Sequence, residues 1–141
     1  MAVTATRALT ISGESSLKFW DTKSQDHPLI HTFADAHPLG GHHVTVDVDN
    51  GGTTAASSGF GQELVVWDLM EGKEKLRSSP AIGEAWALSL SPDGKILNTT
   101  THNGRVILWD ASSLKKISEI DTKGSFGICI ACVLFKPSKL M

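Results

Sequence analysis

Apolar residues recur in three short segments of the chain, and each segment ends on Trp-Asp. In two of them, residues 64–67 and 106–109, every position is apolar. Successive side chains of a β-strand point to opposite faces, so a strand that is apolar throughout must be covered on both faces. The first segment differs because Lys18 stands where the others have Val65 and Ile107. We therefore expect two fully buried strands and one strand with a wetter face.

The Trp-Asp pairs define a repeat. They are Trp20-Asp21, Trp67-Asp68 and Trp109-Asp110, at intervals of 47 and 42 residues. Four-stranded propeller blades repeat at about 40–45 residues. The intervals therefore match those of blades, and a loop insertion accounts for the longer one.

Each repeat contains further segments that predict short strands. Segments rich in small and β-branched residues precede the Trp-Asp strands, at 8–12, 54–58 and 96–100. Between two strand-like segments, Asn103-Gly104 predicts a hairpin turn. Alternating segments lie upstream at 43–49 and 85–91, and polar segments follow each Trp-Asp pair at 29–33, 74–78 and 115–120. Charges in the polar segments suit edge strands. Four antiparallel strands per repeat predict an all-β propeller of about three blades.

Composition and charge narrow the class of protein. Hydrophobic residues make up 40% and charged residues 20% of the chain, as in folded globular proteins. The net charge is −2 and the cations are scattered, so we expect no direct nucleic-acid contact. The longest apolar run, 127–135, is shorter than the roughly 20 residues that cross a bilayer, so we expect no membrane partner. Only two cysteines are present, which favours a reducing intracellular compartment.

The repeats resemble the WD-repeat family, and more narrowly the WD-repeat subunits of superkiller (Ski) complexes and meiotic recombination WD-repeat proteins. The most specific stretches are GEAWALSLSPDGKILNTTTHNGRVILWD at 83–110 and IDTKGSF at 120–126. Residues 44–69 are similar to a second blade of that family, and the resemblance covers about residues 4–130.

The resemblance implies a seven-bladed protein-interaction scaffold without enzymatic activity or cofactor. Its partners would be an RNA helicase and a tetratricopeptide-repeat protein, and its role would be support of exosome-mediated 3′-to-5′ mRNA decay. A meiotic recombination role and a location in cytoplasm and nucleus are also implied. The alternative is a WD-repeat adaptor of another assembly, such as a ubiquitin-ligase substrate receptor or a transcription-elongation complex.

The repeat boundaries indicate an incomplete propeller. We expect a truncated first blade over 1–26 with its outer strand continuing to about 35, a second blade over 36–82, a third over 83–123, and the start of a fourth with an aberrant tail over 124–141. The innermost strand of the first blade would begin before Met1. Since closed propellers have about 4–8 blades, we expect a fragment, the alternative being a genuine short product with exposed sheet faces.

Blades of the family often contain a buried Asp–His–Ser/Thr–Trp hydrogen-bond network. By resemblance, His37, Ser57 or Ser58, and Trp67 fill three of its positions in the second repeat. The aspartate would fall six residues before each Trp, where the chain has Glu14, Gly61 and Asn103. The resemblance therefore predicts a weakened network in every repeat.

Glu84 and Trp86 form a candidate partner face. Trp86 falls on an inner strand where an aliphatic residue would suffice, and Glu84 lies at the entrance of that strand. Tryptophan is enriched at interaction hot spots, so this pair is a candidate for contact with a partner. The alternative is that Trp86 only fills the space between blades.

Other candidate chemistry is weak. The histidines His27, His31, His37, His42 and His43 share a segment with Pro and Gly, which indicates a loop rather than a closed zinc site. Cys129 and Cys132 lie in a strand-like apolar segment, which does not favour a redox pair. Gly51-Gly52 and 59–61 predict hairpin turns, since no phosphate-loop pattern follows. No residue set combines nucleophile, base and orienting group, so we predict no enzyme, metal site or cofactor.

Overall fold

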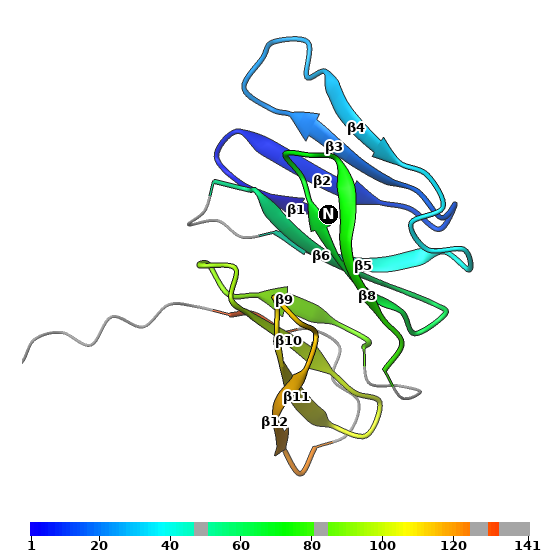
Figure 1. Ribbon diagram of the computed structural model, residues 1–141, viewed down its shortest axis with the longest axis vertical. Coiled ribbons are helices and arrows are strands. Elements are labelled where there is room, and N and C mark those ends of the chain that lie inside the picture. Colours follow the sequence, from blue (N-terminus) through cyan, green and yellow to red (C-terminus); the bar gives the residue numbers. More distant parts are fainter. Residues whose placement is uncertain (47–50, 81–84, 125–129, 133–141) are drawn as a thin grey trace, which may run out of the picture.

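The computed structural model describes residues 1–46, 51–80, 85–124 and 130–132, and these form three four-stranded antiparallel sheets (Figure 1). The first sheet contains β1 (Ala2–Val3), β2 (Arg7–Ile11), β3 (Leu17–Asp21) and β4 (Leu29–Phe33). The second contains β5 (Gly41–Val46), β6 (Thr54–Gly59), β7 (Leu64–Asp68) and β8 (Lys73–Ser78). The third contains β9 (Leu88–Leu90), β10 (Ile96–Thr100), β11 (Arg105–Asp110) and β12 (Lys116–Asp121). In each sheet the four strands are paired in the order in which they occur in the chain. Three such sheets confirm the all-β prediction.

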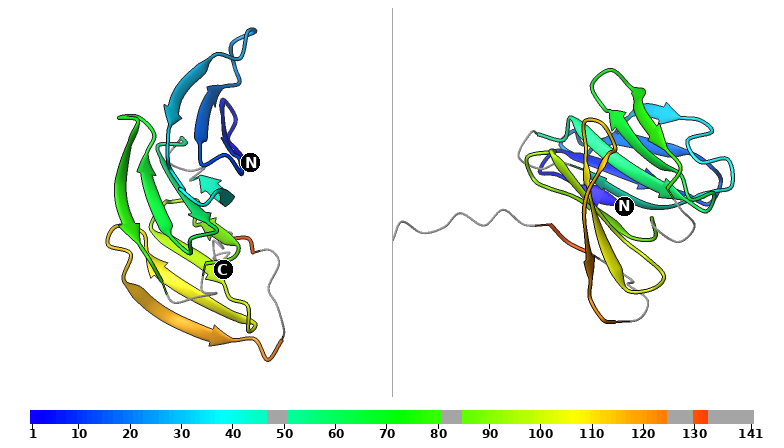
Figure 2. Two further views of the ribbon diagram at one scale, coloured as in Figure 1. Left: turned by 90° about the vertical axis from the view of Figure 1, so that its right-hand side faces the viewer. Right: turned by 60° about the horizontal axis from the view of Figure 1, so that its bottom comes forward.

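The three sheets stand side by side around an arc (Figure 2). Strands of neighbouring sheets contact one another along the arc: β2 contacts β5, and β5 contacts β9. Strands β4, β8 and β12 form the outer edges, and all six residues of β12 are exposed. The polar segments after each Trp-Asp pair therefore form edge strands, as their charges predict.

Two hydrophobic clusters join the sheets, and β7 contributes to both. Val65 and Trp67 pack toward the first sheet, with Leu9, Leu17, Phe19 and Phe33 among the residues of that cluster. Leu64 and Val66 pack toward the third sheet, with Leu97, Ile107 and Trp109. The apolar segment 64–67 is thus buried on both faces, as predicted. The same prediction is wrong for 106–109: Val106 and Leu108 are half-buried, because the described residues place a neighbouring sheet on one face of the third sheet only. Lys18 is exposed, as expected.

The β2–β3, β6–β7 and β10–β11 turns share one length and a left-handed residue at the same position. Each is a three-residue turn with a left-handed residue five positions before Trp: Ser15 (φ 63°), Gln62 (φ 65°) and Gly104 (φ 76°). A left-handed third residue is typical of three-residue hairpin turns. The Asn103-Gly104 signal therefore marks the correct turn, which is one residue longer than a two-residue hairpin. We call the end of the sheets with these turns the Phe60 end, and the opposite end the Asp68 end.

The first and last repeats are described in part. Ala2–Val3 forms a two-residue innermost strand whose Ala2 pairs with Leu9. The proposed opening strand of a fourth blade falls mainly on residues outside the description, and 130–132 form no strand. Within the described ranges, no helix is long and apolar enough to cross a membrane.

Replacing Ile107 by Ala should lower the free energy of unfolding by about 2–5 kcal/mol, because a fully buried isoleucine leaves a cavity between two sheets. Urea denaturation followed by tryptophan fluorescence measures the change. Ile120→Ala on the same sheet is the control, since Ile120 is 53% exposed and its loss should cost little. Equal effects of the two substitutions would contradict the inter-sheet position of Ile107.

Candidate functional site

Each sheet contains one hydrogen bond from a tryptophan to a hydroxyl group on the preceding strand. The indole Nε1–H of Trp20 donates to Thr10 Oγ1 at 3.0 Å, that of Trp67 to Ser57 Oγ at 2.7 Å, and that of Trp109 to Thr99 Oγ1 at 2.9 Å. The acceptor lies ten residues before the tryptophan in all three sheets. The bond satisfies an indole donor that burial would otherwise leave unpaired. It therefore fixes the middle hairpin of every repeat.

In the second sheet this bond extends into a buried network of four side chains. His37 Nε2 lies 2.6 Å from Ser57 Oγ, and His37 Nδ1 lies 2.6 Å from Glu63 Oε1. His37 and Ser57 are fully buried. The structure thus brings together His37, Ser57 and Trp67, and it assigns Ser57 rather than Ser58 to the network. Ser58 Oγ is buried without a hydrogen-bond partner among the described residues.

The proton arrangement in which every donor of the network has an acceptor leaves His37 neutral. Trp67 can only donate, so Ser57 Oγ accepts from it and donates its own hydrogen to His37 Nε2. His37 is then neutral and donates from Nδ1 to the Glu63 carboxylate. Burial lowers the pKa of His37 below its ordinary value of 6.5, although the hydrogen bond to Glu63 opposes that shift. Every member of the network is satisfied, which is the condition under which a buried polar network stabilises a fold.

The expectation of a weakened network is wrong for the second sheet, because the carboxylate comes from another position. Glu63 lies four residues before Trp67 and is 7% exposed. Gly61, which stands where the aspartate was expected, makes room for it: a Cβ there would lie 2.4 Å from Glu63 Oε2. At Gly59 a Cβ would lie 2.3 Å from Glu63 Oε1 and 2.7 Å from His37 Nδ1. The sequence signal for this network is therefore a glutamate that directly precedes an apolar strand and follows two nearby glycines.

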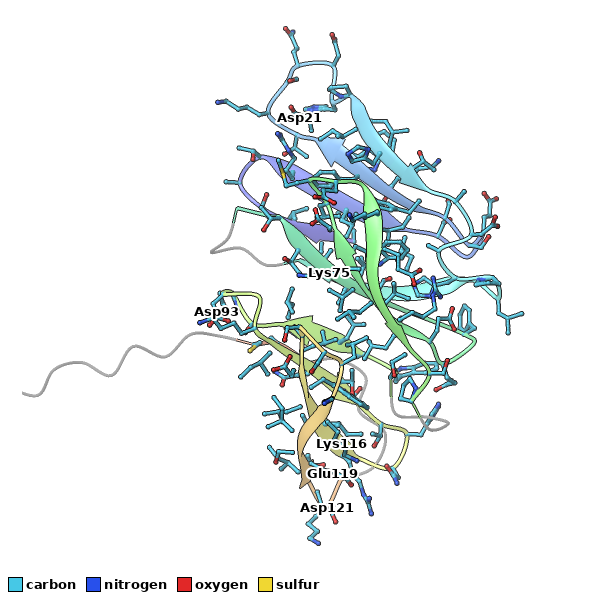
Figure 3. The ribbon with its side chains drawn as sticks, in the orientation of Figure 1. Asp21, Lys75, Asp93, Lys116, Glu119 and Asp121 are labelled. Carbon is cyan, nitrogen blue, oxygen red and sulfur yellow. The ribbon has the colours of Figure 1, made fainter. Side chains whose placement is uncertain are left out.

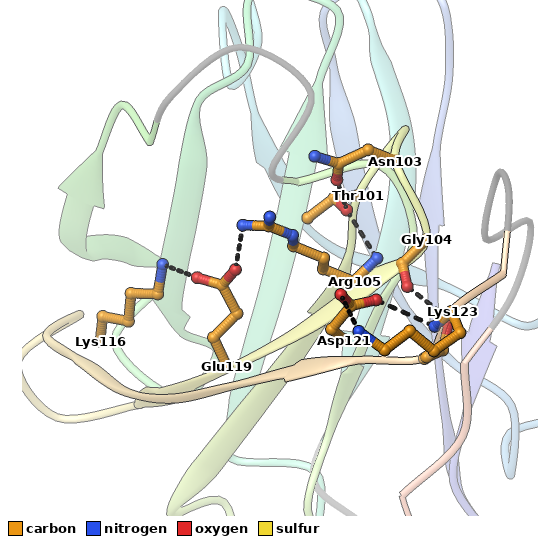
Figure 4. Close-up of polar contacts among 9 residues, drawn as sticks. Thr101, Asn103, Gly104, Arg105, Lys116, Glu119, Asp121 and Lys123 are labelled. Carbon is orange, nitrogen blue, oxygen red and sulfur yellow. Dashed lines mark hydrogen bonds and ion pairs between the residues drawn. The ribbon is translucent and has the colours of Figure 1, made fainter.

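The other two sheets retain only the tryptophan–hydroxyl pair among the described residues. Glu14 is exposed at the β2–β3 turn. Asn103 Oδ1 accepts from Thr101 Oγ1 at 2.5 Å and so stabilises the β10–β11 turn (Figure 4). Nearby, Arg105 pairs with Glu119 across β11 and β12 at 2.5 Å. Neither Glu14 nor Asn103 supplies the missing acid of a buried network.

The Trp-Asp aspartates stabilise the turns that follow them. Asp21 Oδ1 accepts from the backbone N–H groups of Lys23 and Ser24 at 2.8 and 3.2 Å. Asp68 Oδ1 accepts from Met70 and Glu71 at 3.0 and 2.9 Å, and Asp110 Oδ1 accepts from the Ser112 N–H at 2.8 Å. The Lys23 N–H holds the pKa of Asp21 below its usual value, and the Ser112 hydroxyl does so for Asp110. Each of these aspartates therefore forms an Asx turn, in which the side-chain oxygen accepts from the backbone N–H of a residue shortly after it in the chain.

The order Ser57–His37–Glu63 resembles that of a catalytic triad, but its serine is inaccessible. Ser57 is 0% exposed, and its oxygen is bonded to both His37 and Trp67. A catalytic nucleophile must reach a substrate atom, so this arrangement has a structural role.

Trp86, the described member of the candidate partner face, is half-buried at the Phe60 end. Its indole ring lies 4.9 Å from the imidazole ring of His102, and its backbone N–H donates to Thr100 O at 3.1 Å. Neither hydrophobic cluster includes Trp86. Glu84 lies outside the described residues.

The remaining candidates show no converging set of ligands. Among the residues that the structure describes, no group of three or more His, Cys, Asp or Glu side chains could hold a metal ion. The side chains of His42 and His43 lie outside the description, as does Cys129. Cys132 is a half-buried free thiol whose backbone N–H donates to Ser89 Oγ at 2.9 Å.

Comparison with solved structures identifies the fold as that of WD40 propellers. The crystal structure of the RRP9 WD40 repeats superposes with a TM-score of 0.78 at 13% identity, covering 91% of this chain and 39% of that one. The structure of U3-55K gives a TM-score of 0.78 at 12% identity with the same coverage. The chain therefore forms about three blades of a WD40-type propeller, and the three sheets are its blades.

Curated relatives support the WD-repeat family. The chain is 36% identical over 130 residues to the meiotic recombination protein rec14 of Schizosaccharomyces pombe, a match that covers 91% of this chain and 42% of rec14. It is 27% identical over 125 residues to the WD repeat-containing protein SL1-17 of Schistosoma mansoni, covering 89% and 40%. The chain thus spans about two fifths of the length of these relatives. No protein-family model matches it.

Replacing Ser57 by Ala should lower the free energy of unfolding by about 1–3 kcal/mol, because it leaves Trp67 Nε1 and His37 Nε2 unpaired in the core. Ser58→Ala is the matched control, since it removes an adjacent buried hydroxyl that has no partner. That control should be neutral or slightly stabilising. Urea midpoints of the two variants distinguish them, and a larger loss for Ser58→Ala would exclude the proposed network.

Stability should fall as the pH is lowered from 7.5 to 5.5. The pKa of His37 is lowered in the folded protein, so below about 6.5 the unfolded chain binds the additional proton. The stability from neutral His37 is therefore present above that pH and lost as the pH falls toward its folded-state pKa. Urea midpoints measured across this range should flatten in His37→Gln. They should keep their slope in His27→Gln, whose side chain is exposed.

Proposed function

We propose that this chain is part of a protein-interaction scaffold whose partners bind the Phe60 end of the second and third blades. The observation that carries the proposal is a set of exposed or half-buried apolar and aromatic side chains at that end. Leu39 is 72% and Phe60 54% exposed on the second blade, and Trp86 contacts His102 with tilted rings on the third. Apolar groups gathered in this way are typical of protein–protein contact surfaces.

A backbone hydrogen bond joins the two loops that carry Leu39 and Phe60. Phe60 N–H donates to Gly40 O at 2.9 Å, which ties the β6–β7 turn to the segment that carries Leu39. Gly40 has a φ of +94°, and a Cβ at this position would lie 3.2 Å from Phe60 Cδ2. Loop backbones joined in this way lose less conformational entropy on binding than free loops would, which favours affinity. Binding residues are found disproportionately on loops that a rigid scaffold positions in this way.

The biological role proposed for the complete protein follows from its relatives. The 36% identity to rec14 supports a role in meiotic recombination. The sequence of residues 83–110 supports the finer proposal of a subunit in a Ski-type mRNA-decay assembly, with an RNA helicase and a tetratricopeptide-repeat protein as partners. Both roles go with a nuclear and cytoplasmic location. In both, the propeller would act by joining other proteins rather than by catalysis.

Trp86→Ala should reduce the recovery of partner proteins at least about tenfold when the tagged, naturally expressed protein is affinity-purified, because an interface tryptophan often contributes more than 1.4 kcal/mol. Partners are identified by mass spectrometry. Recovery of recombination proteins, or of a helicase with a tetratricopeptide-repeat protein, supports the corresponding role. Ubiquitin-ligase or transcription-elongation subunits would contradict both roles.

Met70→Ala is the matched control, because Met70 is 70% exposed at the opposite, Asp68 end. It should leave partner recovery unchanged. The thermal unfolding midpoint of Trp86→Ala must stay close to that of the parent protein. A lowered midpoint together with lost binding would instead support the view that Trp86 fills the space between blades.

A further inference from the structure

A solvent-open cavity of about 270 Å³ lies between the second and third blades at the Asp68 end. Its lining comes from both blades: Thr54 and Lys75 from the second, and Gly94, Lys95, Asp110, Ala111 and Ser112 from the third. Figure 3 places Lys75 at the junction of the two sheets, with Asp93 on the turn of the third sheet. The volume is at the lower limit of small-molecule sites, so it suits a single side chain of a partner better than a cofactor.

Both lysines of the cavity are exposed and without an ion pair, within the described part of the chain. Lys73, Lys116 and Lys123 have carboxylate partners in Glu71, Glu119 and Asp121, whereas Lys18, Lys23 and Lys115 resemble the cavity lysines in having no ion pair among the described residues. Two unpaired ammonium groups on facing blades favour an anion, since opposite charge is the main source of attraction at such a site.

The carboxylates near the cavity already have donors of their own. Asp110 Oδ1 accepts from the Ser112 N–H, from the Ser112 hydroxyl at 2.5 Å and from the Ser113 hydroxyl at 3.1 Å. Asp93 Oδ1 accepts from the Ser91 hydroxyl at 2.6 Å and from the Lys95 N–H at 3.2 Å. The Ser91 hydroxyl and the Lys95 N–H lower the pKa of Asp93, and the charge of the Lys95 ammonium group adds a smaller effect. These acids reduce the local positive potential, but neither lysine forms an ion pair with them at salt-bridge distance.

The two lysines are not required by the blade itself. Lys75 lies at the register shift of β8, between Leu76, which pairs with Val66, and Glu74, which pairs with Trp67. Ile30 occupies the same position in β4 of the first blade. Lys95 directly precedes Ile96, the residue of β10 that pairs with Asp110. In the second blade, Thr54 pairs with Asp68 in the same way, so the residue that corresponds to Lys95 is Thr53. The junction of the first and second blades therefore has an isoleucine and a threonine where this junction has two lysines.

We propose that this inter-blade cavity binds an anionic side chain of a protein partner between Lys75 and Lys95. The proposal rests on the scaffold function above and adds the chemistry of one contact. The anionic group is a carboxylate or a phosphate, and both would be held by the same ammonium groups. The site exists only while the second and third blades are packed together.

Binding of short peptides to the purified full chain tests the proposal. Three probes share one sequence and carry glutamate, phosphoserine or glutamine at the central position, and fluorescence anisotropy gives their affinities. We expect the glutamate or the phosphoserine peptide to bind more tightly than the glutamine peptide, and the tighter of the two identifies the anion. Lys75→Gln and Lys95→Gln should each weaken that binding about fivefold, as for an exposed ion pair, and more so at low salt.

Lys73→Gln is the matched control, because Lys73 is a neighbouring exposed lysine already paired with Glu71. It should leave the affinity unchanged. Equal binding of all three peptides, or equal effects of the three lysine substitutions, would overturn the proposed site. The scaffold function fails separately, in the partner recovery of Trp86→Ala at the opposite end.

Discussion

Two-sided burial of the middle blade is the constraint on which the rest of the structure depends. Consecutive residues of β7 face different neighbours, with Val65 toward the first blade and Val66 toward the third, and both are fully buried. A single four-stranded sheet could not bury both faces of such a strand, so the repeats must stack. The arc in Figure 2 is the result, and it places the turns of all three blades at two common ends. The candidate binding surfaces described above lie at one of those ends or at a junction between blades, whereas the buried network lies inside the second blade.

The buried network explains why the middle blade can include charged and polar groups in its interior. His37 comes from the segment before β5, Ser57 from β6, and Glu63 and Trp67 from the segment leading into and along β7. Their bonds therefore connect parts of the blade that hydrophobic contacts alone would not orient. A chain of donors that runs from an indole to a carboxylate has no unpaired member, so its burial does not incur the cost of an orphaned polar group.

Much of the fold could be predicted from the sequence because its signals are periodic and local. The apolar segment 64–67, the Trp-Asp interval and the Asn103-Gly104 turn each depend on neighbouring positions, and the structure places them in a buried strand, in three successive sheets and in a hairpin turn. Glu63 could not be placed in the same way. Its role depends on space made by two glycines and on a histidine 26 residues away, which no local pattern reveals. For the same reason, the convergence of Lys75 and Lys95 depends on blade packing and is not visible from their distance in the sequence.

The unequal environments of the three blades have a consequence for how the chain opens. The middle blade shares an interface with both neighbours and contains the buried network, whereas each outer blade shares one described interface. In a stack whose units interact only with their neighbours, the unit with the most interfaces is the last to lose its structure. Backbone amides of β6 and β7 should therefore exchange their hydrogens most slowly, and partial opening should begin from the outer blades. The cavity between the second and third blades would be lost in such an opening before the buried network is.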